Sequence, residues 1–562
     1  MPTQKLNGRT AFLRLLLDEG VTHVFGNPGT TELALMEAMP DAEGLQYVLG
    51  LQEAVVLAMA DGFARASGRL TACNLHCTPG LGHAMGALYN AKFAGSPIIV
   101  TAGQYEIGYG LTEPMLYEPL VPIAQPLVKW AHEVQRVEDL PRVVRRAAKI
   151  AMTPPFGPVF LSLPGSILDD ACEMDLGRRT RVLAHGVPSA EARQEIVEAL
   201  LAAESPVIIA GREIGEQDAM ADAAEFAEVL GAAVYHEPIP YNARFPSRHP
   251  CFMGDLSRSQ PKVRRILEQH DLLVVLGGDM LRMSAYSEVD PMPAGLKVIH
   301  ISEREWELGK NYPTDYAVRA GVRQTLRELV PQLRTGLSSN RARTVAERVS
   351  ALARKNWSAQ REHLLASPQA RATEGPIDAL RLAKEIAANL PPHVIVVEEA
   401  PTTAPMLGAV LLVAGGRDYL GLASGGLGFG MGGAVGAALA RPGTPVVAVI
   451  GDGSAMYAIQ ALWTAAHLKL PVTFVIVNNK AYRIIKERMV AMRQSDRFLG
   501  MDLANPNLNF VSIADGMGVQ AIKITALAEL GQALRSATGR PGPTLLDVAV
   551  DGGQQSVQAE AR

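Results

Sequence analysis

The sequence predicts an α/β protein made of three doubly wound parallel-sheet domains. Short apolar runs rich in β-branched residues alternate with longer helical stretches along the whole chain, which is typical of parallel sheets covered by helices. The length of 562 residues suits several domains, because one domain usually holds roughly 100–200 residues. Polar segments interrupt this alternation near residues 169–180 and 322–371. We therefore expect the domains at residues 1–180, 190–335 and 365–555.

Each domain has its own set of predicted strands. In the first domain the apolar runs cover residues 23–25, 48–52, 71–76, 97–101 and 158–163, with helices predicted over 53–66 and 83–93. The second domain has runs at residues 206–210, 233–236, 272–276 and 298–301. The third has runs at residues 394–397, 446–450, 472–477 and 544–548. The sequence leaves open whether the first and third domains share an architecture, because no duplication is visible.

Composition and charge exclude several classes of protein. Hydrophobic residues make up 48% of the chain and charged residues 20%, as in an average soluble globular protein. The 53 basic and 57 acidic residues give a net charge of −4, so no basic excess is present to bind nucleic acid. Four cysteines are too few for a disulfide scaffold, and they predict reduced thiols in a cytoplasmic enzyme. They are Cys73, Cys77, Cys172 and Cys251.

No targeting or membrane segment is expected. The first twenty residues contain no long apolar run and no small-residue cleavage site, so we predict no export signal. Residues 421–440 are twenty uncharged residues, which is the length of a membrane span. Eight of them are glycine, however, and this favours a buried glycine-rich turn that leads into a tightly packed helix.

Two polar motifs follow neighbouring predicted strands of the third domain. Gly451-Asp452-Gly453-Ser454 follows one strand, and Asn479 follows the next. A strand-helix-strand unit returns the chain to the same sheet edge, where open α/β sheets bind ligands. A carboxylate, an amide oxygen and a nearby carbonyl suit Mg2+ bound with a diphosphate, and the glycines let phosphates approach the backbone. The alternative is a turn and a helix cap that happen to be acidic and amidic.

The spacing of these motifs resembles the signature of thiamine-diphosphate (ThDP) enzymes. The resemblance implies that Glu53, at a strand-to-helix junction of the first domain, activates the pyrimidine ring of ThDP. Taken alone, Glu53 is equally explained as a first-turn helix charge. The resemblance also implies that the Gly425 carbonyl accepts a hydrogen bond from the cofactor amino group and that Leu427 wedges between the two cofactor rings.

The same glycine run also matches a second motif in form. Gly428-x-Gly430-x-x-Gly433 fits a dinucleotide fingerprint, which opens the alternative of a nicotinamide oxidoreductase. No acidic residue follows at a second strand end, so we interpret this match as accidental. The central domain shows no convincing fingerprint either, which leaves FAD without support from the sequence.

Further stretches narrow the resemblance. Benzoylformate decarboxylases are similar to this chain at residues 26–32 (GNPGTTE), 51–54 (LQEA), 74–76 (NLH), 84–88 (AMGAL) and 245–252 (FPSRHPCF). The likeness spans essentially the whole chain and includes a middle-domain string without a cofactor role. It implies pyrimidine-binding, central and diphosphate-binding domains. It also implies a homodimer or homotetramer with active sites between subunits, where Glu53 of one chain faces Asp452 of another.

Site residues are carried over from this resemblance one by one. The implied Mg2+ ligands are Asp452, Asn479 and the Ala481 carbonyl. His76 would handle protons, and Thr30 would bind the substrate carboxylate where the family has serine. The residues expected along the cofactor are Gly425, Leu427, Gly451, Gly453, Ser454 and Tyr482. His83, His236 and His249 are expected to be structural.

Two departures from the family pattern concern the substrate pocket. Ser284 stands where the family has a second active-site histidine, and serine is a poorer proton relay than imidazole. Ile484 narrows the place of an aryl group, and Arg488 replaces a phenylalanine. Arginine there suits a second carboxylate or a phosphate on the substrate. Alternatively, Arg488 belongs to a solvated helix face together with its neighbours.

The implied function is non-oxidative decarboxylation of a benzoylformate-like 2-oxo acid to an aldehyde and CO2, with ThDP and Mg2+ as cofactors. The first alternative is a ThDP carboligase or C–C lyase, similar to acetolactate synthase or 2-hydroxyacyl-CoA lyase, because Ser284 and Arg488 depart from the decarboxylase pattern. Another is a binding protein that has kept the fold without activity. The intact Glu53, Asp452 and Asn479 argue against it.

Overall fold

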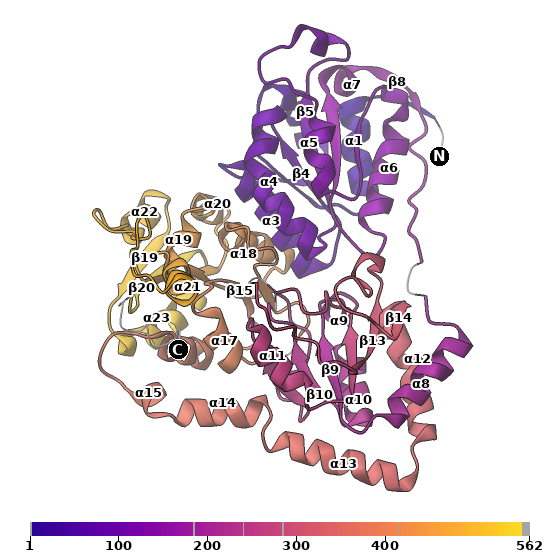
Figure 1. Cartoon of the computed structure of the whole chain (residues 1–562). Coiled ribbons are helices and arrows are strands. Elements are labelled where there is room, and N and C mark those ends of the chain that lie inside the picture. Colours follow the sequence, from indigo (N-terminus) through magenta and orange to yellow (C-terminus); the bar gives the residue numbers. More distant parts are fainter. Residues whose placement is uncertain (1–2, 184–185, 240, 284–285, 414, 553–562) are drawn as a thin grey trace.

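The computed structural model of the chain describes residues 3–183, 186–239, 241–283, 286–413 and 415–552. Three domains are seen, each built around a six-stranded parallel sheet. Figure 1 shows the first domain at the top, the central domain at the lower right and the third domain at the lower left. The predicted fold class is therefore confirmed.

In the first domain the strand order is β3-β2-β4-β5-β7-β6, and all neighbours are parallel. The strands are β2 (His23–Gly26), β3 (Gln46–Leu49), β4 (Thr71–Leu75), β5 (Ile98–Gln104), β6 (Ala131–Glu133) and β7 (Val159–Pro164). The helices are α1 (Gly8–Asp18), α2 (Leu33–Ala38), α3 (Glu53–Ser67), α4 (Cys77–Ala94), α5 (Leu120–Ala124), α6 (Leu140–Ala151) and α7 (Gly165–Asp169). A separate antiparallel pair joins β1 (Gln4–Asn7) to β8 (Ala171–Met174).

The central domain has a different strand order, β11-β10-β9-β12-β13-β14. Its strands are β9 (Pro206–Ala210), β10 (Ala233–His236), β11 (Phe252–Asp255), β12 (Leu272–Leu276), β13 (Lys297–Ser302) and β14 (Tyr316–Arg319). Its helices are α8 (Ala190–Ala202), α9 (Glu213–Glu216), α10 (Met220–Leu230), α11 (Gln260–Leu267) and α12 (Val322–Gly336). Along the lower edge of Figure 1, three helices connect this domain to the third, namely α13 (Ser339–Ala353), α14 (Trp357–Ala366) and α15 (Pro368–Arg371).

The third domain repeats the strand arrangement of the first, with the order β16-β15-β17-β18-β20-β19. The strands are β15 (Ile395–Glu399), β16 (Tyr419–Gly421), β17 (Val446–Gly451), β18 (Val472–Asn478), β19 (Gln520–Ile524) and β20 (Thr544–Ala549). The helices are α16 (Ala379–Asn389), α17 (Ala404–Val410), α18 (Phe429–Ala440), α19 (Asp452–Ala455), α20 (Ala461–His467), α21 (Arg483–Arg493), α22 (Phe510–Gly516) and α23 (Leu527–Thr538). The first and third domains thus share an architecture that their sequences do not reveal.

Both faces of each sheet are covered, as strand β17 illustrates. Val446, Ala448 and Ile450 belong to one core cluster, whereas Val447 and Val449 belong to another. Alternate residues of a strand point to opposite faces, so a strand buried on both faces reads as a continuous apolar run. This is why the central strands of the sheets could be recognised in the sequence.

Helices α3 and α18 join the first and third domains through a tight crossing. A side chain on Gly62 of α3 would overlap the backbone of Gly433, and one on Gly436 of α18 would overlap the backbone of Met59. The backbones therefore approach closely and merge the two domains into one core. The tightly packed helix predicted within residues 421–440 is confirmed as α18, whereas the glycine-rich turn before it is half-buried, with Gly425 exposed. Within the described residues, no helix has both the length and the apolar character that crossing a membrane requires.

Candidate active site

Two polar residues meet at the carboxyl end of the third sheet. Strands β17 and β18 are parallel neighbours, so their ends at Gly451 and Asn478 lie side by side. This register brings Asp452 to the turn that begins at Asn479. Asp452 Oδ2 accepts a hydrogen bond from Lys480 N at 2.6 Å, which fixes the turn against the carboxylate.

The Asp452 carboxylate is 3% exposed and is bound by backbone N–H groups. Its Oδ1 accepts a hydrogen bond from Gly453 N at 2.7 Å. Burial raises the pKa of Asp452 to about 6, although the backbone hydrogen bonds act in the opposite direction. Across the turn, Asn479 Oδ1 accepts a hydrogen bond from Ala481 N at 3.0 Å, and the Tyr482 ring lies against Gly453. The Asp452 carboxylate and the Asn479 side chain are therefore held by the backbone of the same turn.

Glu399, at the end of β15, braces the glycine-rich loop that precedes α18. One carboxylate oxygen accepts a hydrogen bond from Gly428 N at 2.7 Å, and the other accepts one from Gly430 N. Burial raises the pKa of Glu399 to about 8 against these backbone hydrogen bonds. These two hydrogen bonds fix the first turn of α18 and the half-buried Leu427 that precedes it. The sequence analysis missed Glu399. A charged residue at the end of an otherwise apolar strand was the available signal.

Glu53 begins α3 in the first domain and is 8% exposed. The Gln52 side chain caps the helix by accepting hydrogen bonds from the first backbone N–H groups. Glu53 Oε1 accepts a hydrogen bond from Asn27 Nδ2 at 3.3 Å, and Oε2 lies 3.1 Å from His83 Nδ1. The His83 side chain is 62% exposed, so its interpretation as a packing residue is wrong.

His76 lies between β4 and α4, at the same sheet edge as Glu53. A Cβ on Gly80 would lie 3.4 Å from Glu53 Cγ and 3.5 Å from His76 Cβ, so one glycine separates the two side chains. A side chain on Gly29 would overlap the His76 ring, which explains the glycine there. The next residue, Cys77, has a φ of +45°, a strained value for a non-glycine residue that shapes the turn bearing His76.

Glu32 is fully buried beneath His76, and four donors bind its carboxylate. Oε2 accepts hydrogen bonds from Gly29 N and His76 Nδ1, each at 2.9 Å. Oε1 accepts hydrogen bonds from Thr31 Oγ1 at 2.8 Å and from Gly103 N at 3.0 Å. An ionised carboxylate only accepts, so the proton of a neutral His76 ring must lie on Nδ1, which leaves Nε2 as the free acceptor. No role was predicted for Glu32, although it belongs to the motif at residues 26–32.

The two adjacent threonines differ in their contacts. The Thr31 hydroxyl lies 3.1 Å from His76 Nδ1 and 3.3 Å from Cys77 Sγ. Thr30 is exposed at the start of the short 3₁₀ turn Thr30–Glu32. The role of Thr30 in binding a substrate carboxylate stays a prediction.

Comparisons with known proteins identify the family. Three family models match, described as thiamine pyrophosphate enzyme, N-terminal TPP binding domain (residues 6–116), central domain (193–329) and C-terminal TPP binding domain (406–548). A benzoylformate decarboxylase of Pseudomonas aeruginosa is 34% identical, covering 96% of this chain and 98% of the relative. The chain belongs to the thiamine-diphosphate enzyme family.

Other relatives and solved structures span the chain as well. An acetolactate synthase isozyme 1 large subunit of Escherichia coli is 26% identical, covering 98% of this chain and 94% of the relative. The structure of a 4-hydroxybenzoylformate decarboxylase of Rhodococcus jostii has a TM-score of 0.88 at 33% identity, covering 98% of this chain and 100% of that one. A benzoylformate decarboxylase of Polynucleobacter necessarius has a TM-score of 0.87 at 30% identity, covering 98% and 99%. The predicted resemblance is confirmed.

The oxygens at the end of β17 and β18 fit the cofactor of a thiamine-diphosphate enzyme. Mg2+ is held by hard oxygen ligands, and it bridges phosphates with few protein groups. Asp452, Asn479 and the Ala481 carbonyl are such a set. Among the described residues there is no cluster of three or more His, Cys, Asp or Glu side chains suited to a metal ion. A site made of one carboxylate plus amide and carbonyl oxygens is therefore the candidate for Mg2+.

Two of the predicted substrate-pocket residues, Ile484 and Arg488, lie on α21. Thr30 and His76 lie in the first domain, and Ser284 lies outside the described residues. Lys486 pairs with Asp502 at 2.5 Å, and Glu487 pairs with Arg483 at 2.8 Å, so neither neighbour is bound to Arg488. No ion pair of Arg488 is found in the described part of the chain. Its charge adds to burial in lowering the pKa of Arg258 from the central domain. Ile484 is half-buried on the same helix.

The two halves of the site lie on different domains. Among the described residues, the hydrogen bonds of the Glu53 side chain go to Asn27 and His83, and none joins it to Asp452. Asn90 of α4 does bind the third domain, because its Oδ1 accepts hydrogen bonds from Ala423 N at 3.0 Å and Ser424 N at 3.1 Å. This contact orders the loop that carries Gly425 and Leu427.

The central domain has the strand order of dinucleotide-binding folds, with its switch point between β9 and β12. A Cβ on Gly211 would overlap the backbone of Gly278, so the two loops at this point touch. Glu237 fills the space beside them, accepting a hydrogen bond from Asp279 N at 2.9 Å and pairing with Arg244 at 3.0 Å. Glu237 therefore occupies the space beside the Gly278 loop at this switch point.

Proposed function

We propose that this enzyme catalyses the ThDP-dependent, non-oxidative decarboxylation of a 2-oxo acid to an aldehyde and CO2. The observation that carries the proposal is a histidine beside Glu53 whose ring is locked by Glu32 with Nε2 free. Relatives named benzoylformate decarboxylase, at 30–34% identity over nearly the whole chain, support the same reaction.

Each residue has a defined task in this proposal. Asp452, Asn479 and the Ala481 carbonyl hold Mg2+ and through it the diphosphate. Glu53 holds a proton at the pyrimidine ring. The bound cofactor supplies a thiazolium ring that takes up the electron pair of the breaking bond. The bond between the carbonyl carbon and the carboxylate breaks and CO2 leaves. His76 Nε2, the free acceptor of the neutral ring, takes up a proton from solvent and delivers it to the carbonyl carbon.

Substrate selection is assigned to α21 and to Thr30. In this proposal the Thr30 hydroxyl binds the substrate carboxylate, and Ile484 limits the width of the pocket. Arg488 has no ion pair with its neighbours and favours a 2-oxo acid that carries a second anionic group. The four cysteines are free thiols, which fits a reducing, cytoplasmic setting.

A carboligase is the second candidate. It is favoured by relatives named acetolactate synthase, at 26–28% identity, and by the serine at position 284. Decarboxylation and ligation use the same cofactor groups, and they differ in whether a proton or a second carbonyl compound reacts last.

Product analysis tests the two candidates. The protein is first dialysed against EDTA and then reconstituted with ThDP and Mg2+. It is incubated with benzoylformate, pyruvate, branched 2-oxo acids and 2-oxo acids that carry a second carboxylate. We expect aldehyde and CO2 in equal amounts, only after reconstitution. Hydroxyketone as the sole product would replace the first proposal with the second, and turnover without ThDP would contradict both.

A further inference from the structure

The loop at residues 422–428, which we call the cofactor loop, leads from β16 into α18 and carries Gly425 and Leu427. Three of its seven residues are glycine, and glycine-rich backbone has many accessible conformations, so a single loop conformation needs contacts from outside. Glu399 supplies such a contact at Gly428, where the loop ends. The middle of the loop is bound by the other two domains.

All three domains meet at Ala423 of this loop, which is 1% exposed. Its backbone N–H donates a hydrogen bond to Asn90 Oδ1 at 3.0 Å, and its carbonyl oxygen accepts one from Arg282 Nη2 at 3.0 Å. Asn90 lies on α4 of the first domain, and Arg282 follows β12 in the central domain. Side chains from two other domains therefore bind both backbone polar groups of one residue in the third.

Asn90 binds more of the cofactor loop than this one residue. Its Oδ1 also accepts hydrogen bonds from the backbone N and the hydroxyl of Ser424, at 3.1 Å and 3.2 Å, and the same hydroxyl accepts one from Gly426 N at 3.1 Å. On its other side, Asn90 Nδ2 donates to Asp61 Oδ2 at 2.8 Å, and Ser96 donates to the same carboxylate. Because Asp61 accepts from the amide nitrogen, the amide oxygen of Asn90 faces the loop.

Arg282 is held in place by contacts with α4 and with its own domain. Its guanidinium carbon lies 4.6 Å from the centre of the Phe93 ring, which attracts a cation and lies one helical turn after Asn90. Arg282 also pairs with Asp279 at 3.6 Å, and Asp279 N donates a hydrogen bond to Glu237 Oε1 at 2.9 Å. The side chain that reaches the loop therefore has a defined position.

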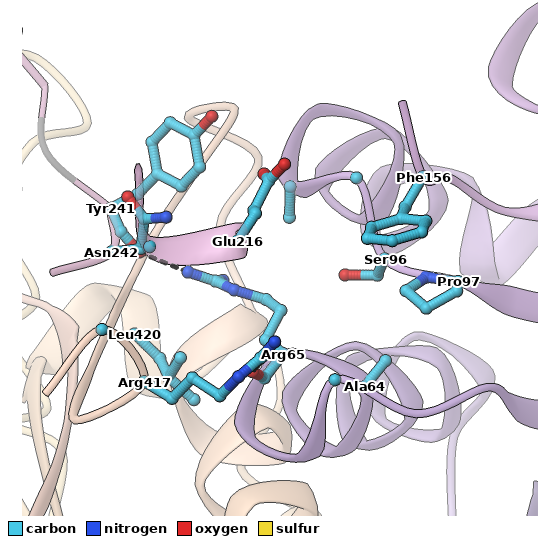
Figure 2. A pocket seen from close by; sticks show the side chains of 15 residues that line it. Ala64, Arg65, Ser96, Pro97, Phe156, Glu216, Tyr241, Asn242, Arg417 and Leu420 are labelled. Atoms are coloured by element: carbon cyan, nitrogen blue, oxygen red, sulfur yellow. Dashed lines mark hydrogen bonds between the residues drawn. The ribbon is translucent and has the colours of Figure 1, made fainter. Parts of the chain in front are cut away.

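The strand before the cofactor loop is attached to the central domain as well. Figure 2 shows Arg65 of α3 extending toward the Tyr241–Asn242 segment, where it donates a hydrogen bond to Tyr241 O. The same carbonyl oxygen accepts a hydrogen bond from Gly421 N at 2.8 Å, and Leu420 forms a single β-bridge with Asn242. The approach to the loop, its middle and its end are thus all bound to other elements.

We propose that Asn90 and Arg282 are positioning residues, which hold the cofactor loop between the first and central domains so that Gly425 and Leu427 face the bound ThDP. The inference rests on the cofactor contacts expected of Gly425 and Leu427 in the proposed function. Within the described residues, neither side chain has a hydrogen bond to the predicted Mg2+ ligands, so the diphosphate end of the site is independent of them. A displacement of about 1 Å in an active site lowers a rate by about 10²-fold.

Hydrogen–deuterium exchange with mass spectrometry tests the loop directly. In the apoenzyme, Asn90→Ala and Arg282→Ala should each speed amide exchange in peptides that cover residues 422–428 by about tenfold or more, because the loop loses a contact that holds it closed. The turn at Asp452 should exchange as it does in the wild type. This measurement uses neither substrate nor cofactor, so its result does not depend on which reaction the enzyme catalyses.

A second measurement tests the effect on the cofactor. C2 is the reacting carbon of the thiazolium ring, and the rate at which bound ThDP exchanges its C2 proton for deuterium is measured without any 2-oxo acid. We expect both variants to lower this rate by about 10- to 100-fold. Calorimetry should give a ThDP affinity within about threefold of the wild type, because the diphosphate end is unchanged.

Two matched controls separate positioning from general stability. Asn356→Ala removes an asparagine that is 5% exposed and accepts a hydrogen bond from Ala359 N at 3.0 Å in α14. Arg264→Ala removes an arginine of the central domain that donates to Asp290 O at 3.0 Å and whose side chain is 33% exposed, against 31% for Arg282. Both controls should match the wild type in loop exchange and in C2 exchange.

Unchanged loop exchange in the two variants would refute the inference. Faster loop exchange with an unchanged C2 rate would refute it too, because the loop would then not position the cofactor. Equal losses in the controls would reduce Asn90 and Arg282 to a structural role. Since the Arg282 side chain is partly exposed, Arg282→Ala keeps the test decisive if Asn90→Ala does not fold.

Discussion

Glu32 accepts a hydrogen bond from His76 Nδ1 at 2.9 Å, and this buried contact sets which nitrogen of the histidine is free for chemistry. The carboxylate belongs to the turn after β2, whereas the histidine follows β4. These strands are neighbours in the sheet, so their ends meet although 44 positions separate the two residues.

Glu32→Gln should lower kcat by about 10²-fold while the ThDP affinity stays within about twofold of the wild type. An amide in place of the carboxylate no longer favours the Nδ1–H form of His76, but it is remote from the diphosphate site. Steady-state kinetics and a ThDP titration measure the two quantities. Glu37→Gln, on an exposed side chain of the adjacent α2, is the control and should behave as wild type. An unchanged kcat in Glu32→Gln would show that His76 is not held in this way.

Complementation tests whether Glu53 and Asp452 of one active site come from two chains. Glu53→Gln and Asp452→Asn should each be inactive alone. In a co-expressed mixture, random pairing makes half of the dimers mixed, and one of the two sites in each mixed dimer is intact. We therefore expect about a quarter of the wild-type activity.

The matched control combines two variants of the same half-site, Asp452→Asn and Asn479→Ala. Every site of that mixture carries one damaged metal ligand, so no activity should return. If the first mixture also stays inactive, Glu53 and Asp452 of the same chain form the site.

Arg488→Ala should reduce kcat/KM for 2-oxo acids with a second carboxylate by roughly 10- to 100-fold, because a charged hydrogen bond to the substrate is lost. Neutral 2-oxo acids should lose less than about twofold. Arg493→Ala, at the exposed end of the same helix, controls for the change in overall charge. An equal loss across the substrate panel would exclude Arg488 as a specificity residue.

His23 should make the protein sensitive to acid. Burial, with Arg69 as the second cause, lowers the pKa of His23 from 6.5 to about 4, and its ring lies 4.7 Å from that of Phe63. Between these pH values the unfolded chain binds a proton that the folded chain does not, so stability falls as the pH falls from 6.5 towards 4.

His23→Phe should therefore reduce the proton uptake on unfolding in this range by about one. Urea unfolding at a series of pH values measures it. The exposed His363→Asn is the control and should leave the pH dependence unchanged. The same pH dependence in His23→Phe and the wild type would contradict the assignment.

The strands that the sequence analysis missed share one physical property. They are β1, β6, β8, β11, β14, β16 and β19, and each lies at the edge of its sheet. Edge strands here are short or half-exposed, as in β14, where half-buried and exposed positions alternate. A continuous apolar run is required only where both faces and both edges are covered, so the interior strands were predictable and these seven were not. The run predicted at residues 48–52 includes the cap of α3, because the strand itself ends at Leu49.

The residues of the candidate site also differ in whether the neighbouring sequence marks them. Asp452 and Glu53 follow apolar runs directly, so a local pattern marks them as residues at a strand end. Glu32 and Glu399 act through partners elsewhere in the chain: Glu32 binds His76, and Glu399 binds the loop before α18. No short-range pattern reports such a contact.

The amino-acid sequence alone determined three α/β units, the oxygen-rich motif after β17 and a coenzyme family. Each of these features depends on the periodicity and spacing of residues that are close together in the chain. Only the tertiary structure decided that the first and third sheets have the same strand order, that Glu32 orients His76, and that Glu399 binds the loop before α18. Those features depend on which strand ends and helix ends the fold brings together, and that is a property of packing across the whole chain rather than of any one segment.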